Sequence, residues 1–227
     1  MKTPWSPICE RIGRPRDVRG QRAKVWGVLW HTTGRGILVR SGGRIDSDAS
    51  LSKALGYYAT PGNAFAHYLI GHGGERVQIA SDAEMAWQAA WTDDERNLYH
   101  RVHNGEARPL WLAWWNRRWP GECCPFGLLN GLPPNQVYVG VETLWHPGGI
   151  TDAQYDSCAR LGADLLTRHR LTVVPGDFDA CDDCRAPAWC GHEDVCPATR
   201  TDRRGRPWDP GTQIDFARLW RETRGYL

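Results

Sequence analysis

A short apolar run that ends on a histidine constrains the fold of this chain more than any other feature. Residues 25–30 carry no charged side chain, and His31 follows them directly. A continuous apolar run of this length is typical of a strand that is buried on both faces of a sheet. The sequence therefore predicts an α/β protein in which this strand delivers His31 to one edge of a mixed central sheet flanked by helices.

Further strands are predicted to join this sheet. Residues 65–70 and 75–80 flank a glycine-rich turn, which is typical of a β-hairpin, and His67 lies on the first of these strands. Residues 136–144 carry valine at alternate positions. Because successive side chains of a strand point to opposite faces, Glu142 is expected to point away from these valines.

Helices are predicted in the C-terminal half. Thr151 and Gln154 form a capping-box signature, and the apolar residues that follow recur at helical spacing as far as Arg170. Residues 171–174 suggest a short strand. A last helix is indicated by Ile214, Phe216, Leu219 and Trp220.

The length of 227 residues suits one domain, with a core at about residues 25–220. Residues 91–135 are rich in tryptophan, proline, glycine and charge without sustained periodicity, and they predict a long irregular insertion over one face. The thirteen tryptophans of the chain serve aromatic packing or sugar stacking, and packing is the preferred interpretation.

A cysteine-rich loop is predicted at about residues 175–191. Four of the eight cysteines lie close together, which suits a tetrahedral structural zinc site, two disulfides or unpaired thiols. The sequence leaves these three alternatives open. The four are Cys181, Cys184, Cys190 and Cys196.

The charge and the first residues exclude two classes of partner. The net charge of +2 comes without a concentrated basic tract, so we expect no binding to nucleic acid. Residues 1–7 lack the apolar run of a signal peptide, and no segment approaches the length that spans a membrane. We therefore expect synthesis in the cytoplasm, no membrane insertion and a monomer.

Two histidines follow predicted strands and suggest a metal site. His31 ends the first apolar run, and His192, in the motif Gly191-His192-Glu193-Asp194-Val195, is expected to follow another strand. Strands that end at the same rim of a sheet bring such side chains together. Two imidazoles and one carboxylate make a zinc site with an open fourth position, where bound water has a pKa of about 7.

The order of several short motifs is more specific than any one of them. Six motifs occur in succession: Trp30-His31-Thr32-Thr33-Gly34, Ala66-His67-Tyr68-Leu69-Ile70-Gly71, Ala86-Trp87-Gln88-Ala89, Val139-Gly140-Val141-Glu142, Gly191-His192-Glu193-Asp194-Val195 and Asp209-Pro210-Gly211. This series resembles the type-2 N-acetylmuramoyl-L-alanine amidases and the related peptidoglycan recognition proteins. The resemblance implies that His31, His192 and Asp209 bind zinc, and that Glu142 is the catalytic glutamate.

The chain departs from this family at the third ligand. The family commonly carries a lysine two residues before that ligand, where Pro207 stands here, and Arg206 or Arg200 is expected to supply the missing charge at the oxyanion. Asp202 competes with Asp209 as ligand, since residues 197–202 align with the same family segment if Arg200 replaces the lysine. Asp209 is favoured because the residues that follow it preserve the family's context.

Other departures concern the substrate groove. The resemblance implies that His67 and Trp87 contact the substrate. The tyrosine often found before the hairpin histidine is Ala66 here, and the histidine usual after Trp87 is Gln88. Aromatic side chains are expected to stack on sugar or stem peptide, drawn from Trp87, Trp91, Trp111, Trp114 and Trp115.

The resemblance thus implies a zinc amidase that cleaves peptidoglycan between N-acetylmuramic acid and L-alanine. Glu142 is expected to take a proton from the attacking water and to return one to the leaving amine. A phage-type lysin that reaches the wall after lysis or virion delivery fits the absent export signal. The alternatives are a peptidoglycan-binding module that has lost turnover, and a zinc-ribbon interaction protein built on the cysteines.

Overall fold

The computed structural model describes most of the chain. Two long segments, residues 34–49 and 172–188, are outside the described residues. The described residues are 5–12, 20, 24–33, 50–60, 62–86, 88–89, 91–119, 124–146, 148–171, 189–201, 204, 210 and 213–227.

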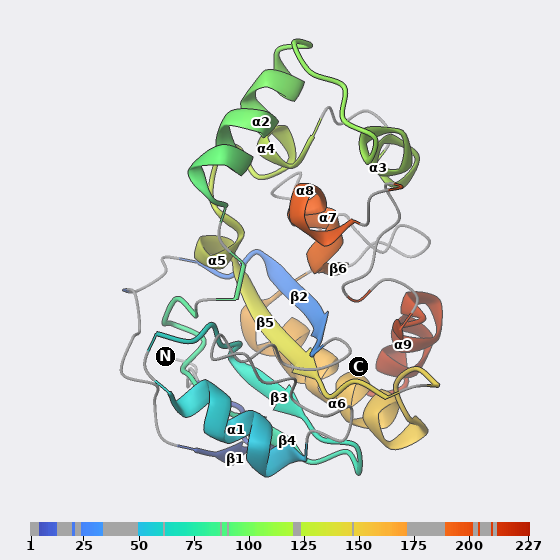
Figure 1. The fold of residues 1–227 in the computed structure, drawn as a ribbon. Helices are drawn as coiled ribbons and strands as arrows, with labels where there is room; N and C mark the ends of the chain where they lie inside the picture. The colour runs from blue at the N-terminus through green and yellow to red at the C-terminus, as the bar shows by residue number, and fades with distance from the viewer. Residues whose placement is uncertain are drawn as a thin grey trace.

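The described residues form a mixed six-stranded sheet in the order β1-β4-β3-β5-β2-β6 (Figure 1). Neighbouring strands run parallel except for the β3–β4 hairpin, which is antiparallel. Every residue of β2 is buried, because the strand lies inside the sheet with helices on both faces. The predicted α/β fold is therefore confirmed. The strands are β1 (Glu10–Arg11), β2 (Gly27–Thr32), β3 (Tyr68–Ile70), β4 (Arg76–Gln78), β5 (Tyr138–Thr143) and β6 (Trp189–Gly191).

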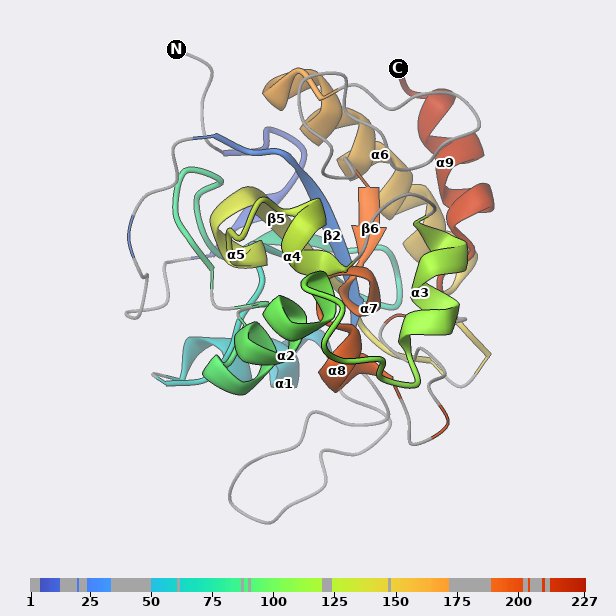
Figure 2. The same cartoon turned by 90° about the horizontal axis from the view of Figure 1, so that it is seen from above.

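Two helices cover one face of the sheet, α6 (Asp152–His169) and α9 (Phe216–Arg224), as Figure 2 shows. The predicted capping box starts α6: the Thr151 hydroxyl accepts from the Gln154 amide at 3.1 Å, and the Gln154 side chain accepts from the Thr151 amide at 2.8 Å. Alternate residues of the central strands, among them Trp30 and Val141, pack on this pair of helices. Both predicted helices are confirmed, whereas Leu171 is not in a strand and residues 172–174 lie outside the described residues.

The opposite face carries the remaining helices in two groups. One group is α1 (Leu51–Ala59), which packs over β3 and β4. The other gathers near the β2–β6 end of the sheet in both views (Figures 1 and 2). Its members are α2 (Asp93–His103), α3 (Leu112–Arg118), α4 (Pro125–Leu128), α5 (Pro134–Val137), α7 (His192–Val195) and α8 (Pro197–Arg200). No described helix is long and apolar enough to cross a membrane.

The predicted irregular insertion is wrong in character, because residues 91–135 contain α2 to α5. A capping box starts α2: Thr92 accepts from the Glu95 amide at 3.1 Å, and Glu95 accepts from the Thr92 amide at 3.0 Å. These short helices bury aromatic side chains against several neighbours at once, so no single apolar stripe marks them in the sequence. Packing is the role of Trp91, Trp111 and Trp115, which are 6%, 4% and 0% exposed.

Candidate functional site

The sheet places His31 and Glu142 side by side. His31 on β2 pairs with Glu142 on the parallel neighbour β5, and the preceding pair is Trp30 with Val141. Since side chains alternate between faces, His31 and Glu142 share the face opposite to Trp30 and Val141, which face α6. His31 is 2% exposed and Glu142 is half-buried. A basic ring and a carboxylate therefore lie together on the face that α1, α7 and α8 cover.

His192 joins His31 because β6 pairs with the other edge of β2. The pair Trp30–Gly191 is the last of this ladder, and His192 follows as the first residue of α7. The His31 and His192 ring centroids are 4.5 Å apart with the ring planes at 71°. The structure thus brings together the two imidazoles that the sequence singled out as ligands.

The turn into α7 is fixed by the residues around His192. The Asp194 carboxylate accepts from the Gly191 amide at 2.8 Å and so caps the helix that starts at His192. A Cβ atom at Gly191 would lie 2.6 Å from the Glu193 carboxylate and 2.7 Å from Pro210 Cδ. This position therefore requires glycine, and Pro210 lies close to the end of β6.

Arg200 brings a positive charge to the same place. It is the last residue of α8, and its Nε atom donates to Nδ1 of His192 at 3.0 Å. Of the two arginines that the sequence offered to replace the family lysine, Arg200 thus lies against a predicted ligand. Arg206 lies outside the described residues.

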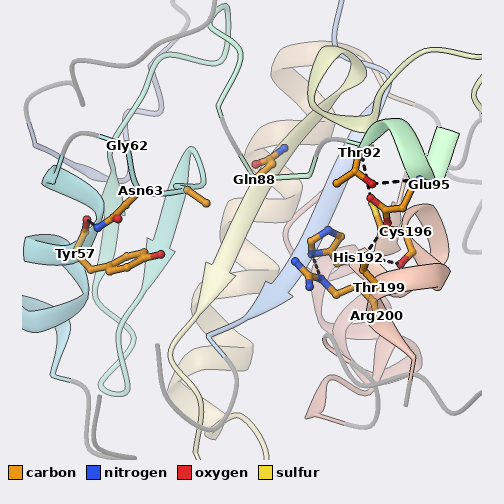
Figure 3. Close-up of a pocket in the computed structure, with 11 residues that line it drawn as sticks. Tyr57, Gly62, Asn63, Gln88, Thr92, Glu95, His192, Cys196, Thr199 and Arg200 are labelled. Atoms are coloured by element: carbon orange, nitrogen blue, oxygen red, sulfur yellow. Dashed lines mark hydrogen bonds between the residues drawn. The ribbon is translucent and has the colours of Figure 1, made fainter. Parts of the chain in front are cut away.

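A cavity of about 360 Å³ opens beside His192 (Figure 3). Figure 3 shows Tyr57 and Asn63 on one side, His192 and Arg200 on the other, and Gln88 between them over the sheet. The cavity runs between the α1 end and the α2, α7 and α8 group, which gives it the form of a site for a ligand laid across the sheet. The lining residues are Tyr57, Gly62, Asn63, Ala64, Gln88, Thr92, Glu95, His192, Cys196, Thr199 and Arg200.

The floor of the cavity depends on Gly140. The Gln88 side chain donates to the Tyr138 carbonyl at 2.8 Å, which lays its amide across β5. A Cβ atom at Gly140 would lie 1.5 Å from Gln88 Oε1, so a larger residue here would displace the Gln88 amide. Gln88, which stands where the family usually has a histidine, therefore lines the same cavity as His192.

His67 does not occupy the position that a substrate-contacting residue needs. It is 0% exposed, its Nε2 atom lies 2.9 Å from the Glu84 carbonyl, and its Nδ1 atom accepts from the Gly140 amide at 3.1 Å. Both ring nitrogens are used to join β5 and the segment after β4. The predicted substrate contact finds no support in this arrangement, and Trp87, its predicted partner, lies outside the described residues.

The two imidazoles fit a zinc site. Zinc in enzymes takes nitrogen and oxygen donors and keeps one position open, and the His31 and His192 imidazoles lie close enough, with ring centroids 4.5 Å apart, to supply two of the nitrogen donors. The described residues contain no group of three or more histidine, cysteine or acidic side chains that would hold a metal. Asp202 and Asp209, the competing third ligands, lie outside the described part.

The predicted cysteine site is unsupported. Cys181 and Cys184 lie outside the described residues. Cys190 and Cys196 are 0% and 1% exposed and belong to the apolar cluster that α2, α3 and β2 share. Within the described residues these two cysteines therefore contribute to packing.

The sequence does not predict a role for Glu95 and Thr199, which line the cavity and join two of the helices around it. The Glu95 carboxylate, 6% exposed, accepts from the Thr199 hydroxyl at 2.8 Å and so joins α2 to α8. The signal was the Thr92–Glu95 spacing, which is the same capping-box pattern that predicted α6. Nothing in the sequence pairs Glu95 with Thr199, because more than one hundred positions separate them.

Comparisons with known proteins identify the family of this chain. The model of the N-acetylmuramoyl-L-alanine amidase family matches residues 21–212, and the chain belongs to that family, whose members hydrolyse amide bonds of peptidoglycan. The resemblance found in the sequence is thus confirmed. A comparison of the sequence with curated proteins found no match.

Two solved structures illustrate the shared fold. An AmpD derivative is 19% identical, with 97% of each chain covered and a TM-score of 0.52. The hydrolase AmiA of Staphylococcus aureus, in complex with its ligand, is 12% identical, with 98% of this chain and 88% of that chain covered and a TM-score of 0.53. At these identities the likeness concerns the fold alone.

Proposed function

We propose that this protein is a zinc-dependent amidase that cleaves the bond between N-acetylmuramic acid and the L-alanine of the stem peptide. The observation that carries the proposal is the 4.5 Å separation of the His31 and His192 rings, with Glu142 beside His31 in the strand register. These side chains come from three strand ends and meet on one face of the sheet. The cavity of about 360 Å³ that His192 lines would give a substrate access to this face.

His31 and His192 would hold the zinc ion together with one aspartate. When bound, zinc polarises the scissile carbonyl and lowers the pKa of a water molecule, which makes water a nucleophile at neutral pH. The contact of Arg200 with His192 supports the alignment in which Arg200 replaces the family lysine, and this alignment makes Asp202 the ligand. Asp209 stays a competitor, because the next residue, Pro210, lies close to Gly191.

Glu142 is the general base of this proposal. A general base must lie within reach of the proton that it takes, and Glu142 is the register partner of a predicted ligand on the face that carries the site. Its half-buried carboxylate takes a proton from the attacking water and returns one to the amine that leaves. This transfer keeps the leaving group neutral when the bond breaks.

Arg200 supplies fixed positive charge. A cation held near the carbonyl oxygen stabilises the negative charge that develops there during attack. In the metal-free protein the guanidinium donates to the Nδ1 lone pair of His192 at the wall of the cavity, and zinc held by His192 would displace this hydrogen bond and release the guanidinium to the oxyanion. Arg206 has the same role in the competing alignment with Asp209.

The test follows the release of L-alanine amino termini from purified peptidoglycan. We expect release by the zinc-loaded protein, loss of release with a chelator, and recovery when zinc is added back. Glu142→Ala should stop release, while Glu10→Ala, an exposed change on β1, should not affect it. Binding to peptidoglycan without release of termini by the zinc-loaded protein would refute the proposal in favour of a binding module.

The lysin role and a monomeric state are further parts of the proposal. A lysin reduces the turbidity of bacteria to which it is added, and Glu142→Ala should remove this effect while wall binding remains. Peptidoglycan is the expected partner. Sedimentation of the purified protein measures its oligomeric state.

A further inference from the structure

Helix α2 is joined to α8 by two hydrogen-bonded side chains. Glu95 Oε1 accepts from the Thr199 hydroxyl at 2.8 Å. The Tyr99 hydroxyl lies 3.4 Å from the same carboxylate oxygen and accepts from the Ala198 amide at 3.2 Å. Two consecutive residues of α8 are therefore held by two residues one helical turn apart on α2.

Burial keeps the hydroxyl of Tyr99 protonated. Burial, followed by the nearby Cys196 and Glu95, raises the pKa of Tyr99 far above its usual value, so its hydroxyl keeps its proton for Glu95. Glu95 also accepts from the Thr92 amide at 3.0 Å, which fixes its rotamer. The carboxylate thus serves as both the cap of α2 and the anchor of α8.

Two tryptophans, one just before α2 and one in α3, also bind α7. Trp91 Nε1 donates to the Val195 carbonyl at 2.8 Å, and Trp115 Nε1 donates to the Asp194 carbonyl at 2.8 Å. Both indoles are buried, with exposures of 6% and 0%. A helix as short as α7 is not stable by itself, because it contains few backbone hydrogen bonds. Its position therefore depends on tertiary contacts such as these two.

These contacts end at the site. Thr199 precedes Arg200, whose Nε atom donates to Nδ1 of His192, and His192 begins α7 (Figure 3). Helix α8 follows α7 directly: the Cys196 amide donates to the His192 carbonyl at 2.9 Å, and the Arg200 amide donates to the Cys196 carbonyl at 3.0 Å. A displacement of α8 therefore moves both Arg200 and His192. Residues that orient metal ligands from behind change metal affinity by about 10- to 100-fold when they are lost.

We propose that Glu95 and Thr199 are positioning residues that set Arg200 and His192 for metal binding and catalysis. This proposal rests on the proposed function, which makes His192 a metal ligand and Arg200 a catalytic residue. Because Glu95 lies in the first turn of α2, the position of α2 determines the position of α8 and, through α8, of Arg200. Helix α2 thus has a function beyond packing.

The test compares Thr199→Val with Thr199→Ser. Valine keeps the shape of threonine and removes the hydroxyl, whereas serine keeps the hydroxyl that Glu95 accepts. Thr60→Val is the matched control, because Thr60 is also an exposed threonine whose hydroxyl donates to one backbone carbonyl, that of Gly56, at 2.9 Å. Glu95→Gln is a second variant that keeps the size of the side chain.

Three measurements test the proposal: Co²⁺ binding, amide exchange, and steady-state kinetics of the zinc-loaded protein. The visible absorption of added Co²⁺ gives the dissociation constant of the metal, and amide exchange of the metal-free protein gives the order of residues 192–200. We expect Thr199→Val to weaken Co²⁺ binding about tenfold, to lower kcat more than it raises KM, and to speed exchange in this segment. Thr199→Ser and Thr60→Val should stay within about twofold of the wild type in all three, since neither removes the hydroxyl that Glu95 accepts.

The outcomes separate this inference from the proposed function. Wild-type protein that binds Co²⁺, with a Thr199→Val variant of unchanged affinity and exchange, would overturn the positioning role alone. Wild-type protein that neither binds Co²⁺ nor releases amino termini would overturn the proposed function and the role of Glu95 at a metal site with it. Weakened binding in Glu95→Gln as well as Thr199→Val supports the inference.

Discussion

The guanidinium of Arg200 donates to Nδ1 of His192 at 3.0 Å, so a fixed cation lies against one of two converging imidazoles. Arg200→Gln removes the charge, and we expect kcat to fall about 10²- to 10³-fold, since loss of one group that stabilises an oxyanion has this effect. Arg200→Lys should recover part of the rate. Steady-state kinetics on soluble peptidoglycan fragments measures both, and an Arg200→Gln variant with wild-type kcat would rule out the role.

Glu142→Gln separates proton transfer from metal binding. The amide keeps the size of the carboxylate but cannot accept a proton, so we expect kcat to fall about 10²- to 10⁴-fold. Zinc content, measured by mass spectrometry of the purified protein, should stay at the wild-type level. A variant that loses zinc together with activity would instead make Glu142 a ligand.

Asp202→Asn and Asp209→Asn decide the third ligand. The position of Arg200 favours Asp202, so we expect Asp202→Asn to weaken Co²⁺ binding by more than about tenfold and Asp209→Asn to have a smaller effect. Both proteins are titrated with Co²⁺ under the same conditions. The opposite order of affinities would assign the ligand to Asp209 and the missing charge to Arg206.

Periodicity and motif order predicted the centre of the site. The apolar run before His31 and the alternation around Glu142 are properties of single strands, and they survive in the sequence because buried strands need them. The strand register then places the two residues side by side without further information. His192 was found through its motif, since the three-residue strand before it is too short to give a pattern.

The supporting contacts could not be predicted in the same way. Glu95 and Thr199 meet only because the helical group folds back over β2, and no local pattern encodes that approach. His67 shows the converse: its motif suggested a substrate contact, but full burial and two hydrogen-bonded ring nitrogens make it part of the framework. Sequence patterns therefore predicted which side chains come together at the candidate site better than the contacts that hold these side chains in place.

A buried ionic cluster away from the site predicts how stability depends on pH. Asp82 accepts hydrogen bonds from Arg168, His169 and Tyr68, with the His169 and Tyr68 distances at 2.8 and 2.6 Å. Burial alone raises the pKa of Asp82, but the hydrogen bond from His169 and the charge of Arg168 outweigh it and hold the pKa below its usual value. The cluster joins β3, the segment after β4 and the end of α6.

A carboxyl group with a lowered pKa stabilises the fold above the pKa it has when unfolded, about 3.9, and loses this effect as pH falls through its folded pKa. We therefore expect the free energy of unfolding in urea to drop below about pH 4. Asp82→Asn should cost about 1–3 kcal/mol at pH 7, because Arg168 loses one of its two carboxylate partners and keeps Asp164, and should flatten the acid limb. Asp156→Asn is the control for an exposed carboxyl: Tyr226 and Arg160 also lower the pKa of Asp156, but solvent screens these contacts, so this variant should change the curve much less than Asp82→Asn. An acid limb in Asp82→Asn as steep as in the wild type would assign the pH dependence to other carboxylates.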